Sequence, residues 1–174
     1  MPRKRIRKFG SPTHYVAETW ARERPDLNPS DYLFLMHVLR LGRVIDRLDD
    51  RYCRQRFGIS GADMRVLFAL RRGQRDDAPR PADLAHAQIV TTGAMTKQLD
   101  RLEALKLVKR RQDETIGGGV LVTATKKGIT LADLAITEMI EKSPLSAKRS
   151  RLSRAERDQI AKLCAKALLE LEEK

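Results

Sequence analysis

Residues 80–123 have the sequence RPADLAHAQIVTTGAMTKQLDRLEALKLVKRRQDETIGGGVLVT, and this stretch decides the fold. A short helical pattern follows Pro81, and a turn at residues 88–90 precedes a second helix that opens on Thr91 or Thr92. A basic segment, a glycine-rich tip and a short β-branched run complete the stretch. The predicted order of elements is therefore helix, turn, helix and hairpin.

The second helix of this stretch is predicted to have one buried face and one open face. Met95, Leu99 and Leu102 recur at spacings of four and three, so they form a single apolar stripe. The opposite face carries small, hydroxylated and cationic side chains, which suit close entry into the major groove of DNA. For such a helix taken alone, the alternative to a DNA-binding face is the solvent-exposed face of an ordinary amphipathic helix. The neighbouring helix and hairpin favour DNA binding. The candidate contacts are Thr91, Thr92, Gly93, Thr96, Lys97 and Arg101.

A hairpin is predicted after this helix. Apolar residues at 107–108 and 120–122 flank the segment KRRQDETIGGG, which indicates two strands joined by a flexible tip. Lys109, Arg110 and Arg111 stand where such a hairpin would meet the sugar-phosphate backbone. We therefore expect these three cations to hold the backbone of bound DNA.

The whole segment resembles the winged helix-turn-helix of the MarR (multiple antibiotic resistance regulator) family. The runs ALRRG, TTGAMTKQLDRLE, LVKR and LVTATKKG resemble the urate-responsive PecS/HucR branch in particular. The likeness covers residues 20–171 and is most specific at residues 93–96 and 99–103. It implies a mainly α fold with a small β-hairpin wing and dimerisation helices at both chain ends. It also implies a ligand-responsive repressor that binds a pseudo-palindromic operator as a homodimer.

The tip of the predicted wing departs from the family pattern, which places Asp-Arg-Arg there. The matching positions are Ile116, Gly117 and Gly118. Either a basic amino-terminal arm compensates, or affinity depends more on phosphate contacts. The arm spans residues 1–12, and a solubilising tail is its alternative role. Its cations are Arg3, Lys4, Arg5, Arg7 and Lys8.

Composition indicates a globular protein with a polyanionic partner. The chain has 174 residues, of which 41% are hydrophobic and 33% are charged. Lys and Arg outnumber Asp and Glu by 35 to 23, and the net charge of +12 predicts double-stranded DNA rather than a membrane as the partner. No apolar run approaches the roughly 20 residues of a membrane-spanning helix, and Cys53 and Cys164 are too far apart for a disulfide framework. We expect a cytoplasmic protein whose cysteines fill helix faces.

Both ends of the chain are predicted to form dimerisation helices. The run YLFLMHVL, in a helix predicted over residues 31–57 with Ser30 or Asp31 as its cap, is apolar nearly all round. Ser153 and Glu156 form a capping box before a last helix with an apolar stripe. A helix buried on more than one side needs a second partner, and another copy of the chain is the simplest one. The predicted segments are the arm (1–12), dimerisation and ligand-pocket helices (13–57), the winged helix-turn-helix lobe (58–124) and C-terminal dimerisation helices (125–174).

A small aromatic or phenolic acid is the effector that the resemblance implies, bound between the dimer helices and the DNA-binding lobe. Trp20 would supply a stacking plane, while His37, Arg40 and Arg65 are candidates to face a carboxylate. Arg65 stands where the urate-responsive branch has an acid, and Gln98 stands where it has an arginine. We therefore expect another planar acid rather than urate. Structural or solvated roles for Arg40 and Arg65 are the alternative.

Nothing in the sequence supports catalysis. His14, His37 and His86 lack metal-ligand spacing, and no phosphate-binding loop or nucleophile motif is present. We therefore expect no enzyme, no metal and no cofactor. Two non-enzymatic alternatives to a ligand-responsive regulator remain, namely an architectural winged helix that binds DNA without sequence choice or effector, and a winged helix that contacts only proteins.

Overall fold

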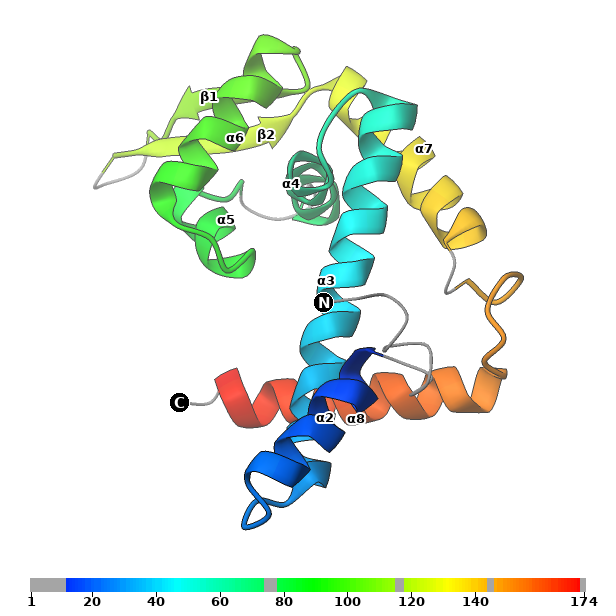
Figure 1. Cartoon of the computed structure of the whole chain (residues 1–174). Helices are drawn as coiled ribbons and strands as arrows, with labels where there is room; N and C mark the ends of the chain where they lie inside the picture. Colours follow the sequence, from blue (N-terminus) through cyan, green and yellow to red (C-terminus); the bar gives the residue numbers. More distant parts are fainter. Residues whose placement is uncertain (1–11, 74–77, 115–117, 144–145, 173–174) are drawn as a thin grey trace. The chain divides into compact units, whose positions relative to one another are not determined.

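The computed structural model describes residues 12–73, 78–114, 118–143 and 146–172, so most of the predicted basic arm lies outside it. The chain forms two compact units, residues 1–61 and 62–174. Within the described residues the fold is mainly helical, with one two-stranded antiparallel sheet (Figure 1). The predicted fold class, a mainly α protein with a β-hairpin wing, is confirmed.

The first unit is a helical pair. Helix α2 (Pro12–Glu23) packs against α3 (Pro29–Phe57). Thr13 and Ala17 of α2 are buried, and Thr13 Oγ1 lies 2.8 Å from Nε2 of His37. The packing of α2 removes the Thr13 hydroxyl from water, and this hydrogen bond between the two helices gives it a partner.

Asn28 caps α3. Its side-chain oxygen accepts a hydrogen bond from the backbone N–H of Ser30 at 3.0 Å. The prediction that Ser30 or Asp31 would be the cap was therefore wrong, because the helix begins earlier than the apolar run suggested. Gly58 ends the helix with a φ of 72°, a left-handed conformation that costs glycine little.

The apolar half of α3 is exposed in the single chain. Its large apolar side chains have exposed fractions between 38% and 66%, which is unusual for so many neighbouring residues of one helix. Apolar side chains exposed in such number mark a contact surface. They are Phe34, Leu35, Val38, Leu39, Leu41, Val44 and Leu48.

The core of the second unit is built around α6. Met95, Leu99 and Leu102 of this helix are fully buried, as the spacing predicted. Helix α5 packs against α6, and α6 packs against β1 (Figure 1). The elements of the unit are α4 (Gly61–Arg72), α5 (Pro81–Ala87), α6 (Thr92–Ala104), β1 (Val108–Gln112), β2 (Val120–Ala124), α7 (Lys126–Lys142) and α8 (Arg154–Glu172).

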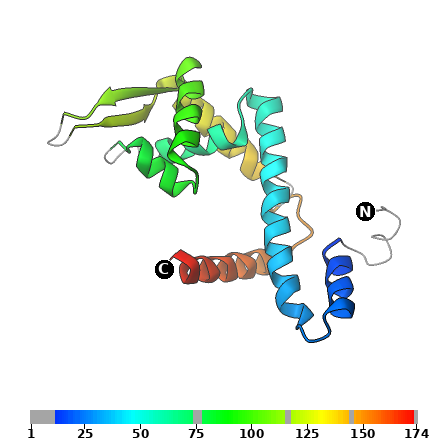
Figure 2. The same ribbon diagram turned by 60° about the vertical axis from the view of Figure 1, so that its left-hand side comes forward.

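The two strands pair antiparallel to form the predicted hairpin. Val108 lies opposite Ala124, and Arg110 lies opposite Val122. The backbone N–H of Val122 also donates to the carbonyl of Pro79 at 3.0 Å, which ties β2 to the segment before α5. Figure 2 shows the strands extending beyond α6. The hairpin is therefore anchored at its base and projects from the helices.

Helix α8 follows the predicted capping box. The backbone N–H of Ser153 donates to Glu156 Oε2 at 2.7 Å, and the Glu156 N–H donates to Ser153 Oγ at 3.2 Å. The hydrogen bonds from Ser153 lower the pKa of the Glu156 carboxyl. The helix has no buried residue among those described, and its apolar side chains are 41% to 72% exposed. They are Ile160, Leu163, Leu168, Leu169 and Leu171.

The junction between the hairpin and α7 is closely packed. Thr125 caps α7, and its backbone N–H donates to the carbonyl of Leu107 at 3.0 Å. Gly128 donates to Thr125 Oγ1 at 3.1 Å. A Cβ atom on Gly128 would lie 2.1 Å from the carbonyl oxygen of Leu107. Only glycine fits here, because backbone occupies the space of a side chain.

We expect Gly128→Ala to lower the free energy of unfolding by about 2 kcal/mol, since the start of α7 must move away from Leu107. Denaturant unfolding followed by circular dichroism measures the change. Gly93→Ala is the matched control, because nothing lies within 4 Å of a Cβ at that position. Equal stability of the Gly128→Ala variant and the parent would contradict the close packing at this junction.

Candidate nucleic-acid interface

A left-handed turn joins α5 to α6. The backbone N–H of Val90 donates to the carbonyl of Ala85 at 3.0 Å, and Ile89 has a φ of 54°. This backbone conformation is unfavourable for a β-branched residue, and the Ile89 side chain is 86% exposed. The turn then leads directly into Thr91, whose hydroxyl accepts a hydrogen bond from Ala94 N–H at 3.2 Å and caps α6. The predicted helix-turn-helix is thus present.

The outer face of α6 is exposed along its first two turns. Thr92, Gly93, Thr96 and Lys97 are exposed, and a Cβ on Gly93 would meet nothing within 4 Å. Thr96 donates its hydroxyl proton to the carbonyl of Thr92 at 3.0 Å, so its oxygen keeps acceptor capacity. Small hydroxylated residues therefore surround one lysine on a surface that another macromolecule can approach closely.

Arg101 is held by an acid from another helix. Its Nη2 donates to Asp63 Oδ1 at 2.7 Å, and its Nε lies 3.3 Å from Asp63 Oδ2. The Asp63 side chain is only 6% exposed, whereas that of Arg101 is 53% exposed. One edge of the guanidinium group is thus used inside the protein. The residue remains at the surface, but its orientation is set by α4.

Arg110 is held by α6, the recognition helix of the helix-turn-helix. Its Nη1 donates to Glu103 Oε2 at 2.6 Å, and its Nη2 donates to Asp100 Oδ1 at 2.7 Å. Partial burial lowers the pKa of Arg110, but the two carboxylates outweigh this effect and the pKa is raised above its ordinary value. Because side chains alternate along a strand, Lys109 and Arg111 leave β1 on the face opposite Arg110. The three consecutive cations therefore do not form one surface.

Arg80 is a basic residue at the wing that sequence reasoning missed. Its Nη2 donates to Asp113 Oδ2 at 2.8 Å, and the Asp113 side chain is 7% exposed while that of Arg80 is 50% exposed. The backbone N–H of Asp113 also donates to the carbonyl of Gly119 in the hairpin at 2.9 Å. No local pattern could have found this pair, because its members are 33 residues apart. At the tip, Gly118 has a φ of 61°, and Ile116 and Gly117 lie outside the described residues.

The predicted ligand residues do not gather in one site within either unit. Trp20 lines a cavity of about 270 Å³ in the first unit, where His37 is bonded to Thr13 and Arg40 is exposed. In the second unit Arg65 lines a different cavity of about 480 Å³. Gln98 does not line that cavity. It is 7% exposed in the core, and its Oε1 has no hydrogen-bond partner in the part of the chain that the structure describes.

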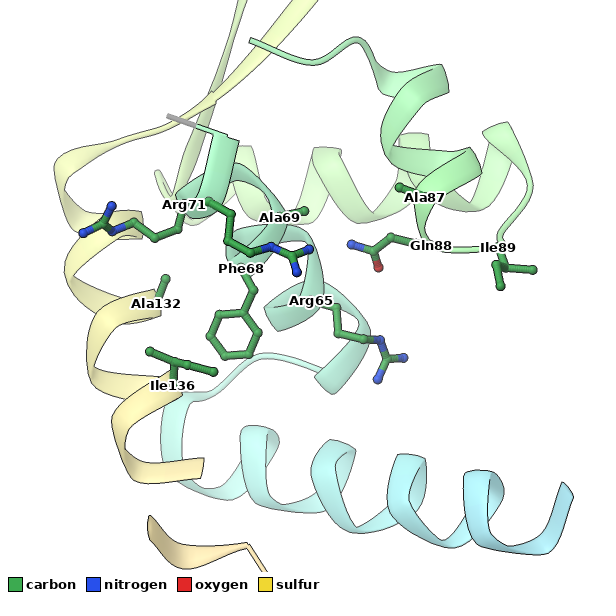
Figure 3. Close-up of a pocket in the computed structure, with 10 residues that line it drawn as sticks. Arg65, Phe68, Ala69, Arg71, Ala87, Gln88, Ile89, Ala132 and Ile136 are labelled. Atoms are coloured by element: carbon green, nitrogen blue, oxygen red, sulfur yellow. The ribbon is translucent and has the colours of Figure 1, made fainter. Parts of the chain in front are cut away.

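The larger cavity lies between α4, the turn after α5, and α7. Figure 3 shows Phe68 of α4 beside Ile136 of α7, with the Gln88 side chain directed inward from the turn and Ile89 at the edge of the cavity. Arg71 is paired with Asp133 of α7 at 2.8 Å. The complete lining is Arg65, Phe68, Ala69, Arg71, Arg72, Ala87, Gln88, Ile89, Ala132 and Ile136. An apolar floor with three guanidinium groups suits an aromatic anion.

The described residues lack metal-binding clusters and membrane-spanning helices. They contain no group of three or more metal-ligating side chains that could hold an ion. No helix among them is long and apolar enough to cross a membrane.

No family model matches the chain, but individual proteins do. The HTH-type transcriptional regulator PecS of Dickeya dadantii (strain 3937) is 27% identical over 126 residues, which cover 72% of this chain and 75% of PecS. The S. aureus MepR–DNA complex is 25% identical with a TM-score of 0.63, covering 81% of this chain and 95% of MepR. The oxidized form of MarR from E. coli is 26% identical with a TM-score of 0.61, covering 77% of this chain and 91% of MarR.

The chain is similar to winged helix-turn-helix transcriptional regulators of the MarR family and has their fold. The match to PecS is consistent with the branch that the sequence runs indicated. A mutant MarR from E. coli in complex with operator DNA has the same fold, with a TM-score of 0.65 over 86% of this chain. These MarR-family relatives are regulators of transcription, in agreement with the expectation that the chain is not an enzyme.

The burial of Gln98 leads to a prediction about stability. A buried amide oxygen without a partner is costly, so Gln98→Met, which keeps the side-chain length, should raise the free energy of unfolding by about 1 kcal/mol. DNA affinity should not change, since this side chain is not at the surface. Thermal and denaturant unfolding measure the first effect, and a loss of stability would mean that the amide makes a favourable interaction in the folded protein.

Proposed function

We propose that this MarR-family protein binds duplex DNA as a homodimer and represses transcription until a small aromatic or phenolic acid releases it from its operator. The observation that carries the proposal is the exposed face of α6, with Thr92, Gly93, Thr96 and Lys97 opposite a fully buried apolar stripe. The MepR complex with DNA and the MarR complex with operator DNA support DNA as the partner.

Each side chain of this face has a role in the proposal. Thr92 and Thr96 hydrogen-bond base edges, and Gly93 permits close approach of the helix to the groove. Lys97 neutralises a phosphate, and Arg101, which Asp63 holds in place at the surface, contacts the backbone. Thr91 both caps α6 and stands at the end that would enter the groove first. Lys109 and Arg111 of the wing contact the backbone beside the groove.

The exposed apolar faces of α3 and α8 support a homodimer. Side chains such as Phe34 of α3 and Leu171 of α8 are 66% and 72% exposed, although they are large and apolar. A second copy of the chain covers such faces with matching apolar surface. Two recognition helices related by a two-fold axis would then read half-sites about one helical turn apart.

Lys97→Ala tests the DNA-binding face. We expect an operator selected from random DNA to bind the variant more weakly by about 1 kcal/mol or more, with a shallower dependence on salt, because phosphate contacts are lost. Fluorescence anisotropy at several salt concentrations measures both quantities. Light scattering of the complex should give two chains per operator.

Four outcomes would contradict the proposal. Unchanged affinity of Lys97→Ala would exclude this face of α6. A specificity ratio well below about 10³ between operator and random DNA would favour an architectural protein without sequence choice. A single chain in solution at micromolar concentration would remove the dimer, and a complete lack of binding at low salt would favour a domain that contacts only proteins.

The effector site of the proposal is the 480 Å³ cavity of the second unit, a size usual for small-molecule sites. Phe68 and Ile136 offer apolar contacts to a ring. Arg71 is tied to Asp133, whereas Arg72 has no ion-pair partner among the described residues. Arg72 is therefore the cation best able to bind a carboxylate, with Arg65 beside it.

Arg72→Ala should raise the Kd for salicylate, a small phenolic acid used as a probe, about tenfold or more, because a charge-assisted hydrogen bond is lost. Arg71→Ala is the matched control and should change the Kd less than about threefold, because Arg71 already has a carboxylate partner. Arg65→Ala should blunt salicylate-induced release while leaving DNA affinity nearly intact. Calorimetry measures the Kd for salicylate, and fluorescence anisotropy measures release from DNA. Equal effects of Arg71→Ala and Arg72→Ala on this Kd would reject the assignment of Arg72 to the bound carboxylate.

A further inference from the structure

The recognition helix carries no net charge of its own. Within α6 (Thr92–Ala104), Lys97 and Arg101 are cationic, and Asp100 and Glu103 are acidic. The charge of Arg101 is in turn balanced by Asp63 at 2.7 Å. A helix proposed to approach a polyanion therefore exposes two carboxylates. The Asp100 side chain is 58% exposed and that of Glu103 is 41% exposed, so both would lie in the field of DNA phosphates.

Arg110 lies on these two carboxylates. Its guanidinium group donates to Asp100 and Glu103 through different nitrogens, and its backbone N–H donates to Glu103 Oε1 at 3.2 Å. A third acceptor is the carbonyl of Thr96, 3.5 Å from Nη2. Only 26% of the Arg110 side chain is exposed. Little of the guanidinium group remains for a phosphate, since the protein already supplies its acceptors.

We propose that Arg110 supports DNA binding without touching DNA, by neutralising the carboxylates of Asp100 and Glu103 that would otherwise repel the phosphates. The inference rests on the proposed DNA-binding function. It revises the expectation that Arg110 holds the DNA backbone together with Lys109 and Arg111. A residue of this kind shapes the electrostatic potential of the interface from beneath its surface.

A double-mutant cycle separates this role from direct contact. Arg110→Met removes the charge and keeps an unbranched side chain for packing, and it is made in the parent and in an Asp100→Asn, Glu103→Gln background. Operator affinity is measured by fluorescence anisotropy for the full-length protein. Neutralisation of the two acids by Arg110, called masking below, predicts that Arg110→Met lowers operator affinity about tenfold or more in the parent. The loss should be less than about twofold in the neutral background, because no carboxylates remain there to be masked.

Lys97→Ala is the matched control for direct contact. It should weaken binding by a similar factor in both backgrounds, because its phosphate contact does not depend on the two acids. Arg110→Lys keeps the positive charge and should retain most of the affinity in the parent. Unfolding midpoints of all variants are compared, and affinities are interpreted for the variants that remain folded at the assay temperature. If Arg110→Met unfolds, the affinities of the neutral background and of Arg110→Lys still test the inference.

The failures of the inference and of the proposed function differ. If Arg110→Met costs the same factor in both backgrounds, or if the neutral background binds operator less tightly than the parent, masking is overturned while DNA binding stands. If the parent binds no DNA at low salt, the proposed function fails and the inference falls with it. If Arg110 only tied β1 to α6, neutralising the two acids would not restore operator affinity to Arg110→Met, because the connection between β1 and α6 would still be missing.

Discussion

The orientation of α6 is the constraint on which the rest of the structure depends. Met95, Leu99 and Leu102 are fully buried, so the helix cannot rotate about its axis without exposing them and burying its charged face. Three ion pairs, made with residues of two other elements, hold the helix in the same orientation. Asp63 of α4 holds Arg101, and Arg110 of β1 holds the acids of α6. The outer face of the helix is therefore presented by a rigid frame.

The charge of the chain overstates the positive charge available at this face. The net charge is +12 for the whole sequence, yet Arg80, Arg101 and Arg110 each have a carboxylate partner at 2.6–2.8 Å. These arginines connect elements of the fold. Lys97 on α6, together with Lys109 and Arg111 on the opposite face of β1 from Arg110, has no such partner among the described residues. Any dependence of DNA binding on salt would arise mainly from these three cations, which have no carboxylate partner among the described residues.

The larger cavity and the recognition helix share a segment of backbone. Gln88 and Ile89 line the cavity, and Thr91, two residues after Ile89, caps α6. Ile89 holds a left-handed φ of 54° that a β-branched residue rarely adopts. A molecule in the cavity would thus contact the turn that sets the first residues of the recognition helix. This contact within one unit is a short physical route between the proposed effector and the proposed DNA-binding face.

The sequence by itself determined the local features of this protein. The order of helix, turn, helix and hairpin, the buried stripe of α6, the Thr91 cap and the Ser153–Glu156 capping box all follow from residues within a few positions of one another. Only the tertiary structure decided which cations are available, since Asp63 is 38 residues from Arg101 and Asp113 is 33 residues from Arg80. It also placed Gln98 in the core and paired Arg110 with the two acids of α6. The reason is physical: periodicity reports how a side chain is directed from its own helix or strand, whereas the partner that it meets there is set by the packing of distant elements.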